Sequence, residues 1–157
     1  MSAGSMNDDD GGHPRVLVAN RSSIAGPLAL DEEALAALAR ATLLAEGHGS
    51  VELSLSLVDE DEMAELHERY MQEPGPTDVL TFPLDEEDVD EGGVRMLGDV
   101  VIAPSVAARH NPLDPEAEMR LLVVHGVLHV LGYDHEQADE RVEMWSRQER
   151  YSGVAIP

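Results

Sequence analysis

The pattern of apolar and polar residues predicts four β-strands in this chain, two by alternation and two as apolar runs. Arg15–Asn20 and Val51–Val58 place apolar side chains on one face and polar ones on the other. This period of two is typical of half-buried strands. Leu97–Ala103 is a nearly continuous apolar run, and Val79–Phe82 is a short one that ends at Pro83. Because proline cannot donate to a sheet ladder, we expect Val79–Phe82 at or near a sheet edge.

Helical patterns lie between and after these strands. Asp31–Glu46 has an acidic first turn, continues in alanine and leucine, and ends before a glycine turn. Asp59–Met71 starts at a capping-box pattern that Glu62 completes. Asp114–Leu131 begins with an N-cap and proline, and a last helix covers roughly Ala138–Tyr151. Together the elements predict a single α+β or α/β domain with one small mixed sheet.

The composition limits the kind of protein further. The chain has 157 residues, enough for one domain with a sizeable core, and its lack of cysteine excludes disulfides and cysteine-based zinc sites. Residues 1–14, rich in aspartate and glycine, predict a disordered acidic leader, which leaves 15–157 as the domain. No apolar run approaches the ~20 residues of a membrane span, and the start is not a secretory signal. We therefore expect a cytoplasmic protein that does not contact membranes.

The charge of the chain is strongly negative. Acidic residues number 32 against 10 basic ones, all arginine, for a net charge of -22. Nucleic-acid binders usually carry a basic surface, so the charge alone argues against such a partner. Genome composition and a salty cytoplasm are alternative origins of the acidity. If RNA is the substrate, we expect weak non-specific binding, because few side chains can displace counterions from phosphates.

The residues best suited to chemistry lie in His125–His135, which reads H-G-V-L-H-V-L-G-Y-D-H. His125 and His129 are four residues apart on a predicted helix, so they share one face about one turn apart. Gly132 suits the left-handed conformation that ends a helix, and such a turn would bring His135 toward the other two histidines. Three imidazoles with one coordination position open are the donor set of a catalytic zinc site.

A histidine on an apolar helix is more often a core residue with one hydrogen-bond partner than a ligand. Here apolar residues surround the two histidines on all sides of the helix, which predicts a central, buried helix. Burying two imidazoles without partners would cost about 1–3 kcal/mol each, and metal ligation removes that cost. The other histidines lie in the leader (His13), in a glycine turn (His48), on a polar helix (His67) and near the site in sequence only (His110).

The histidine spacing also matches the metzincin pattern H-E-x-x-H-x-x-G-x-x-H at every position but one. Gly126 replaces the glutamate that is the general base of those proteases. The metal geometry is retained, but the water-activating carboxylate of a peptidase is not. Because a glycine within a helix costs about 1 kcal/mol relative to alanine, we expect Gly126 to allow close approach of the substrate or of a neighbouring strand.

At these residues the sequence resembles the YbeY family, bacterial zinc-dependent endoribonucleases. The family signature H-G-x-L-H-x-x-G-Y-D-H is matched throughout by His125–His135. Pro76–Pro83 resembles the family's P-T-D-V-L-S-F-P, and Leu97–Ile102 resembles its L-G-D-I-V-I. Leu57–Glu60 is similar to the family's strand-to-helix junction, and the resemblance extends over Val16–Tyr151.

The resemblance implies an α+β fold with a mixed sheet and a zincin-like metal site on the central helix. It implies one Zn²⁺ per subunit, held by His125, His129 and His135, and cleavage of single-stranded RNA. The implied role is maturation of the 16S ribosomal RNA 3′ end and late ribosome quality control. The implied partners are ribosomal RNA and a small-subunit ribosomal protein or an assembly GTPase.

The expected chemistry uses the open zinc position, which binds a water or a phosphoryl oxygen. Zinc stabilises the transition state as a Lewis acid and lowers the pKa of bound water to about 7. Asp134 is a candidate for orienting a ligand imidazole, with capping of the turn as the alternative. Met71 stands where the family has a functional arginine, so Arg95 and Arg109 are candidate RNA contacts, with plain surface charge as the alternative.

Two functions of other classes remain as alternatives. One is a zincin-type metallopeptidase, which Gly126 argues against. The other is a non-catalytic, zinc-containing ribosome-assembly factor, which Met71 and the acidity of the chain favour.

Overall fold

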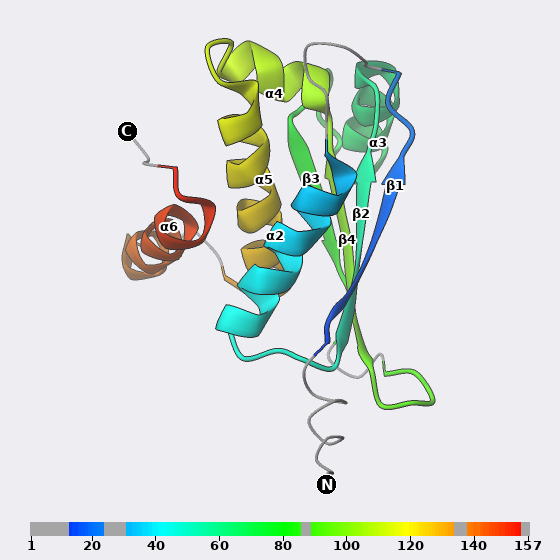
Figure 1. Ribbon diagram of the computed structural model, residues 1–157. Helices are drawn as coiled ribbons and strands as arrows, with labels where there is room; N and C mark the ends of the chain where they lie inside the picture. The colour runs from blue at the N-terminus through cyan, green and yellow to red at the C-terminus, as the bar shows by residue number, and fades with distance from the viewer. Residues whose placement is uncertain (1–12, 24–30, 86–88, 134–137, 155–157) are drawn as a thin grey trace, which may run out of the picture.

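Figure 1 shows the computed structural model, which describes residues 13–23, 31–85, 89–133 and 138–154. Within these residues the chain forms an α+β domain with one four-stranded sheet and five helices. The strands are β1 (Arg15–Asn20), β2 (Val51–Leu57), β3 (Val79–Pro83) and β4 (Arg95–Ile102). The helices are α2 (Glu32–Ala45), α3 (Glu60–Met71), α4 (Pro104–His110), α5 (Pro115–Val130) and α6 (Ala138–Ser152).

The sheet is mixed, and its strand order is β1-β2-β4-β3. β1, β2 and β4 run parallel to one another, whereas β3 runs antiparallel to β4. β3 therefore forms an edge of the sheet and ends at Pro83, which confirms both the predicted mixed sheet and the predicted edge position.

α2 and α5 cover one face of the sheet. Leu53, Leu55 and Leu57 alternate along β2 with half-buried residues, and all three are buried in the layer beneath these two helices. α5 lies between the sheet and α6, and α2 lies beside it (Figure 1). This position confirms the prediction that the histidine-bearing helix is central.

The opposite face of the sheet carries a second, smaller core. Met63 of α3 packs there with Leu80 of β3 and Val101 of β4. α3 continues to Met71, so its carboxyl end lies near the edge strand, where the Tyr70 ring packs edge-on against Phe82 with ring centroids 5.2 Å apart.

Two local predictions differ from the structure. The short helix α4 was not predicted, because Pro104 at its first turn follows directly on the apolar strand and leaves no polar N-cap signal. The predicted capping box of α3 is wrong: Asp59 makes no side-chain cap bond. Its Oδ1 instead accepts hydrogen bonds from the backbone N–H and hydroxyl of Ser23, and Glu62 pairs with Arg21. Hydrogen bonds from Ser23 to Asp59 therefore take the place of the expected cap within α3.

Some sequence predictions fall on parts of the chain that the structure does not describe. Residues 1–12 of the predicted leader, Asp134 and His135 all lie outside the described residues. In the described ranges, no helix has the length and apolar character that crossing a membrane requires.

Candidate metal centre

The second half of α5 holds two of the three predicted metal ligands. The helix starts where Asp114 accepts a hydrogen bond from the backbone N–H of Ala117, at 3.1 Å, with Pro115 in the first turn. One helical turn separates His125 from His129, and their ring centroids lie 4.6 Å apart at an interplanar angle of 70°. The structure therefore brings this pair together as the spacing predicted.

The histidine pair lies on the accessible side of the helix. Across residues 122–130 of α5, His125 and His129 are half-buried, and every other residue is buried. This corrects the prediction that the helix is buried all round. The imidazoles lie at the boundary between core and solvent, so the expected cost of burying them is smaller, and a substrate can approach them.

Gly126 lies where α5 packs closely against β4 of the sheet. A Cβ atom at this position would lie 2.5 Å from Cγ1 of Val100 in β4, far inside van der Waals contact. Because β4 packs directly on the helix here, the prediction of a close approach is confirmed, and the neighbour is the strand. A glutamate, as in the metzincin pattern, has no space at this position.

Gly132 follows α5 in the left-handed backbone conformation. This residue has a φ of 110°, and its N–H donates to the His129 carbonyl at 3.0 Å. The next N–H, from Tyr133, donates to the Leu128 carbonyl, also at 3.0 Å. The predicted left-handed helix end is therefore confirmed, and the two hydrogen bonds fix the start of the segment that leads to Asp134 and His135.

Gln148 of α6 orients the first imidazole. Nδ1 of His125 lies 2.8 Å from Oε1 of Gln148, a residue that is 5% exposed. An amide oxygen only accepts hydrogen bonds, so Nδ1–H is the donor and Nε2 carries the lone pair that a metal requires. The local donor set thus fits a metal ion. Sequence reasoning missed Gln148, because nothing near it in the chain signals a contact 23 residues away.

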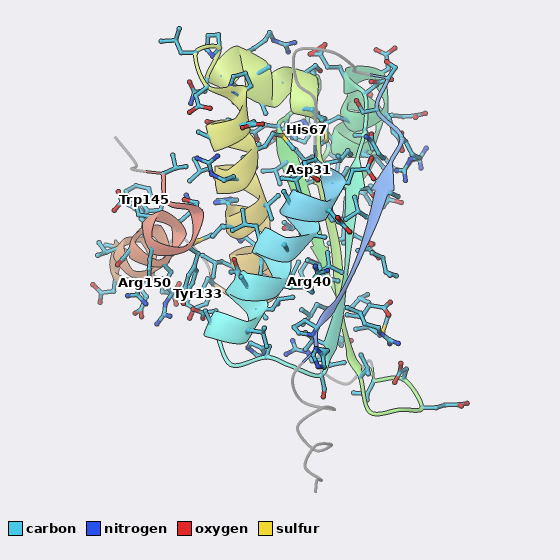
Figure 2. The ribbon with its side chains drawn as sticks, in the orientation of Figure 1. Asp31, Arg40, His67, Tyr133, Trp145 and Arg150 are labelled. Carbon is cyan, nitrogen blue, oxygen red and sulfur yellow. The ribbon has the colours of Figure 1, made fainter. Side chains whose placement is uncertain are left out.

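A buried carboxylate from α2 joins the elements around the metal centre. Glu46, whose side chain is 6% exposed, accepts hydrogen bonds from the Tyr133 hydroxyl at 2.6 Å, from Arg147 at 2.8 Å and from the Tyr151 hydroxyl. Burial raises the pKa of Glu46, but the three donors outweigh burial and hold it below its usual value. Burial and the negative charge of Glu46 raise the pKa of Tyr133 to about 12, so this phenol remains a donor. Figure 2 shows Tyr133 between α6 and the end of α2.

A second group of residues with metal-ligating side chains lies at the opposite end of α5. Ligand atoms of Asp78, His110 and Glu118 all lie within 4.8 Å of one another and could hold a metal ion. Nδ1 of His110 is 3.1 Å from Oδ2 of Asp78. Burial first, and then the charge of Asp78, raises the pKa of Glu118, while His110 lowers it. From the sequence His110 was expected to be near the histidine segment in the chain only, and no local spacing indicates its contacts with Asp78 and Glu118.

The two candidate RNA contacts lie on separate elements. Arg109 of α4 forms an ion pair with Glu60 at the start of α3. Arg95 is the first residue of β4, and its backbone N–H donates to the Ser50 carbonyl at 3.0 Å. Met71, at the position of the family arginine, is exposed at the end of α3 beside Tyr70. The structure brings neither arginine to Met71, so their RNA-binding roles stay predictions.

The fold and the site together define a class of protein. It is a small α+β domain whose central helix presents an i, i+4 histidine pair on its accessible side, with a glycine between the histidines packed against a parallel strand.

Comparison with known proteins narrows this class to one family. The sequence model of endoribonuclease YbeY matches residues 21–153. Endoribonuclease YbeY of Thermobifida fusca is 51% identical over 144 residues, which cover 83% of this chain and 87% of that protein. The protein of the same name from Beutenbergia cavernae is 47% identical over 132 residues, covering 79% and 88%. The solution structure of TM1509 from Thermotoga maritima matches with a TM-score of 0.58 and 33% identity over 87% of each chain.

The chain belongs to the endoribonuclease YbeY family. It is accordingly an enzyme of the hydrolase class, a nuclease that cleaves phosphodiester bonds within RNA. The resemblance in the histidine segment and the two upstream motifs is thereby confirmed.

Proposed function

We propose that the protein is a single-strand-specific zinc endoribonuclease that matures the 3′ end of 16S ribosomal RNA and acts in late ribosome quality control. The observation that carries the proposal is the half-buried pair His125 and His129, with Gln148 on the Nδ1 atom of the first ring. In this proposal residues 15–157 form the nuclease domain, residues 1–14 form an acidic leader, and the protein works in the cytoplasm.

The zinc would be held by His125, His129 and His135. When bound, zinc supplies a Lewis acid that stabilises negative charge on a phosphoryl oxygen during phosphodiester cleavage. The protein's own part is to hold the ligand rings in place. Gln148 fixes the tautomer and orientation of His125, and Asp134 is proposed to orient a second ring. His125 and His129 are half-buried rather than buried, so both rings reach the surface of the described part of the protein.

The net charge of -22 constrains how the substrate is reached. Few side chains can displace counterions from phosphates, so affinity for random RNA is expected to be low at physiological salt. We propose that Arg95 and Arg109 contribute phosphate contacts. A small-subunit ribosomal protein or an assembly GTPase would then supply the remaining affinity by placing the ribosomal RNA.

The packing of Gly126 weighs against the alternative of a metallopeptidase. The general base of that class would occupy this position, but even a Cβ atom there meets Val100 at 2.5 Å. The alternative of a non-catalytic assembly factor predicts zinc binding without RNA cleavage, and the following experiment separates it from the proposal.

The test compares the wild type with His129→Ala on a precursor of small-subunit ribosomal RNA, with zinc content measured in both. The wild type is expected to hold about one zinc and to cut the precursor, and the variant is expected to lose both properties. His13→Ala, which removes an exposed imidazole ahead of β1, is the matched control and should keep both. Equal, weak cleavage by all three proteins would indicate a contaminating nuclease and end the proposal.

A further inference from the structure

Glu46 accepts hydrogen bonds from Tyr133, which follows α5, and from Arg147 and Tyr151 of α6. It lies at the carboxyl end of α2 and is not part of the histidine segment. We propose that Glu46 is a positioning residue for zinc: it holds Tyr133, and with it the segment leading from α5 to the third histidine ligand. This inference rests on the proposed zinc site and adds a residue that the histidine signature does not contain.

Tyr133 is held both through its backbone and through its side chain. Two backbone hydrogen bonds fix Gly132 and Tyr133 against the last turn of α5. The Tyr133 side chain then extends to Glu46, with its hydroxyl 2.6 Å from Oε1. Two residues of chain span at most about 7 Å, so the position of Tyr133 limits the space that His135 can reach.

The Tyr133 side chain contacts both Arg147 and Glu46. The guanidinium of Arg147 lies 5.2 Å from the centre of the Tyr133 ring, and the same guanidinium donates to Oε2 of Glu46 at 2.8 Å. The Tyr151 hydroxyl donates to the same carboxylate oxygen. Hydrogen bonds to an ionised carboxylate are stronger than neutral ones, and this one is buried, so the arrangement resists rotation of the tyrosine.

Glu46 is also connected, through α6, to the proposed ligand His125. Arg147 precedes Gln148 in α6, and Gln148 binds Nδ1 of His125. By holding Arg147 and Tyr151, Glu46 keeps α6 in the position from which Gln148 reaches the first imidazole. A single buried side chain thus supports the ring of His125 and the start of the segment that carries His135.

The test measures zinc affinity by competition with a chromogenic chelator. Glu46→Gln keeps the size of the side chain but removes its charge, and it is expected to weaken zinc binding about 10–100-fold, the usual effect of losing a group that supports a ligand. Tyr133→Phe removes only the hydroxyl and is expected to weaken zinc binding in the same direction. The double variant should bind zinc no more weakly than Glu46→Gln, because the Tyr133 hydroxyl acts through Glu46.

Glu143→Gln is the matched control. Glu143 pairs with the same Arg147 at 2.8 Å, but its side chain is 56% exposed, and the Tyr133 hydroxyl donates to Glu46 instead. Substitution of Glu143 by glutamine should leave zinc affinity unchanged. Thermal unfolding of the metal-free proteins separates loss of fold from loss of zinc, and Tyr133→Phe keeps the test decisive if Glu46→Gln does not fold.

Failure of this inference and failure of the proposed function give different results. If His129→Ala binds zinc as tightly as the wild type, the proposed site itself is wrong. If His129→Ala loses zinc while folded Glu46→Gln and Tyr133→Phe bind it with wild-type affinity, the zinc site stands and the role of Glu46 is overturned. An equal loss of affinity in Glu143→Gln would also overturn it.

Discussion

The two ends of α5 carry two histidine-containing groups that differ in how their side chains are held. Toward the carboxyl end, one helical turn sets the spacing of His125 and His129, and a buried amide fixes one ring. Toward the amino end, Asp78 precedes β3, His110 and Glu118 belong to α4 and α5, and the His110 side chain is 52% exposed. In the first pair the buried Gln148 orients the ring of His125, whereas in the second group the exposed ring of His110 contacts the half-buried Asp78.

Support sharpens the difference. Asp78 and Glu118 are half-buried, and His110 is exposed. Fixing these three side chains around a metal ion costs side-chain entropy, whereas the buried Gln148 already holds the ring of His125. A metal site is therefore defined by the neighbouring residues that hold the ligand side chains in place as well as by the ligand residue types.

The largest expected effect separates the two groups directly. His125→Ala should reduce zinc content from about one equivalent to near zero and lower RNA cleavage by at least about 100-fold, because a ligand is lost. His110→Ala should retain zinc and activity. Metal analysis of the purified proteins and a cleavage assay measure both. A loss of zinc in His110→Ala as large as that in His125→Ala would reverse the comparison.

The next largest effect is expected for Glu46, whose carboxylate holds the residues around the carboxyl end of α5. Its folded pKa lies below the ordinary glutamate value of about 4.3. The stability that it supplies is therefore fully present above that pH and is lost as pH falls through the folded pKa. Glu46→Gln should be about 2 kcal/mol less stable at neutral pH. It should also lose less stability than the wild type on acidification, as urea unfolding between pH 3 and 7 measures. Parallel acid profiles would contradict this assignment.

A smaller effect is expected at Gly126. Alanine there gains about 1 kcal/mol of helix propensity but meets Val100, and overpacking of a core costs about 1–3 kcal/mol. We expect a net loss of about 1 kcal/mol in the free energy of unfolding, measured in urea on the metal-free protein. In a chain that already carries Val100→Ala, the same substitution should cost less, because the methyl groups that it meets are gone. An equal cost in both backgrounds would show that the contact is not the cause.

The smallest effect is expected at Glu118, and its sign is opposite to that at Glu46. The folded pKa of Glu118 is raised, so the folded state holds its proton to a higher pH than the unfolded chain. Stability is lost as pH rises from the ordinary value through the folded pKa. Glu118→Gln should therefore be as stable as the wild type or slightly more stable at neutral pH, within about 0.5 kcal/mol. A clear destabilisation in the same urea series would show that the carboxylate is needed.

The sequence predicts the parts of the site that depend on local spacing. The histidine pair, the left-handed Gly132 and the close approach at Gly126 all follow from positions on one helix, where geometry is set by helical pitch. Gln148 and Glu46 could not be found in this way. Glu46 meets Tyr133 across 87 residues and Tyr151 across 105, so only the folded chain brings them together.

The fold shows the same division. The strands and long helices follow from alternation and caps, and the central position of α5 follows from its apolar sequence. α4 was missed because an apolar strand leads straight into it. The capping box at Asp59 does not form. The Asp59 carboxylate accepts hydrogen bonds from Ser23, 36 residues away, and not from its own helix.

The parallel pairing of β2 with β4 has a consequence for how the chain folds. Leu57 ends β2 and Arg95 begins β4, and α3 and β3 lie between them in the chain. Two parallel strands cannot be joined by a tight hairpin. A long segment must therefore be ordered, at a cost in chain entropy, before β2 and β4 can pair. The helices can form early, but the sheet against which α5 packs forms late. We expect folding on the slow side for a domain of this size, with the surface of α5 that faces β4 exposed to other chains until the sheet closes.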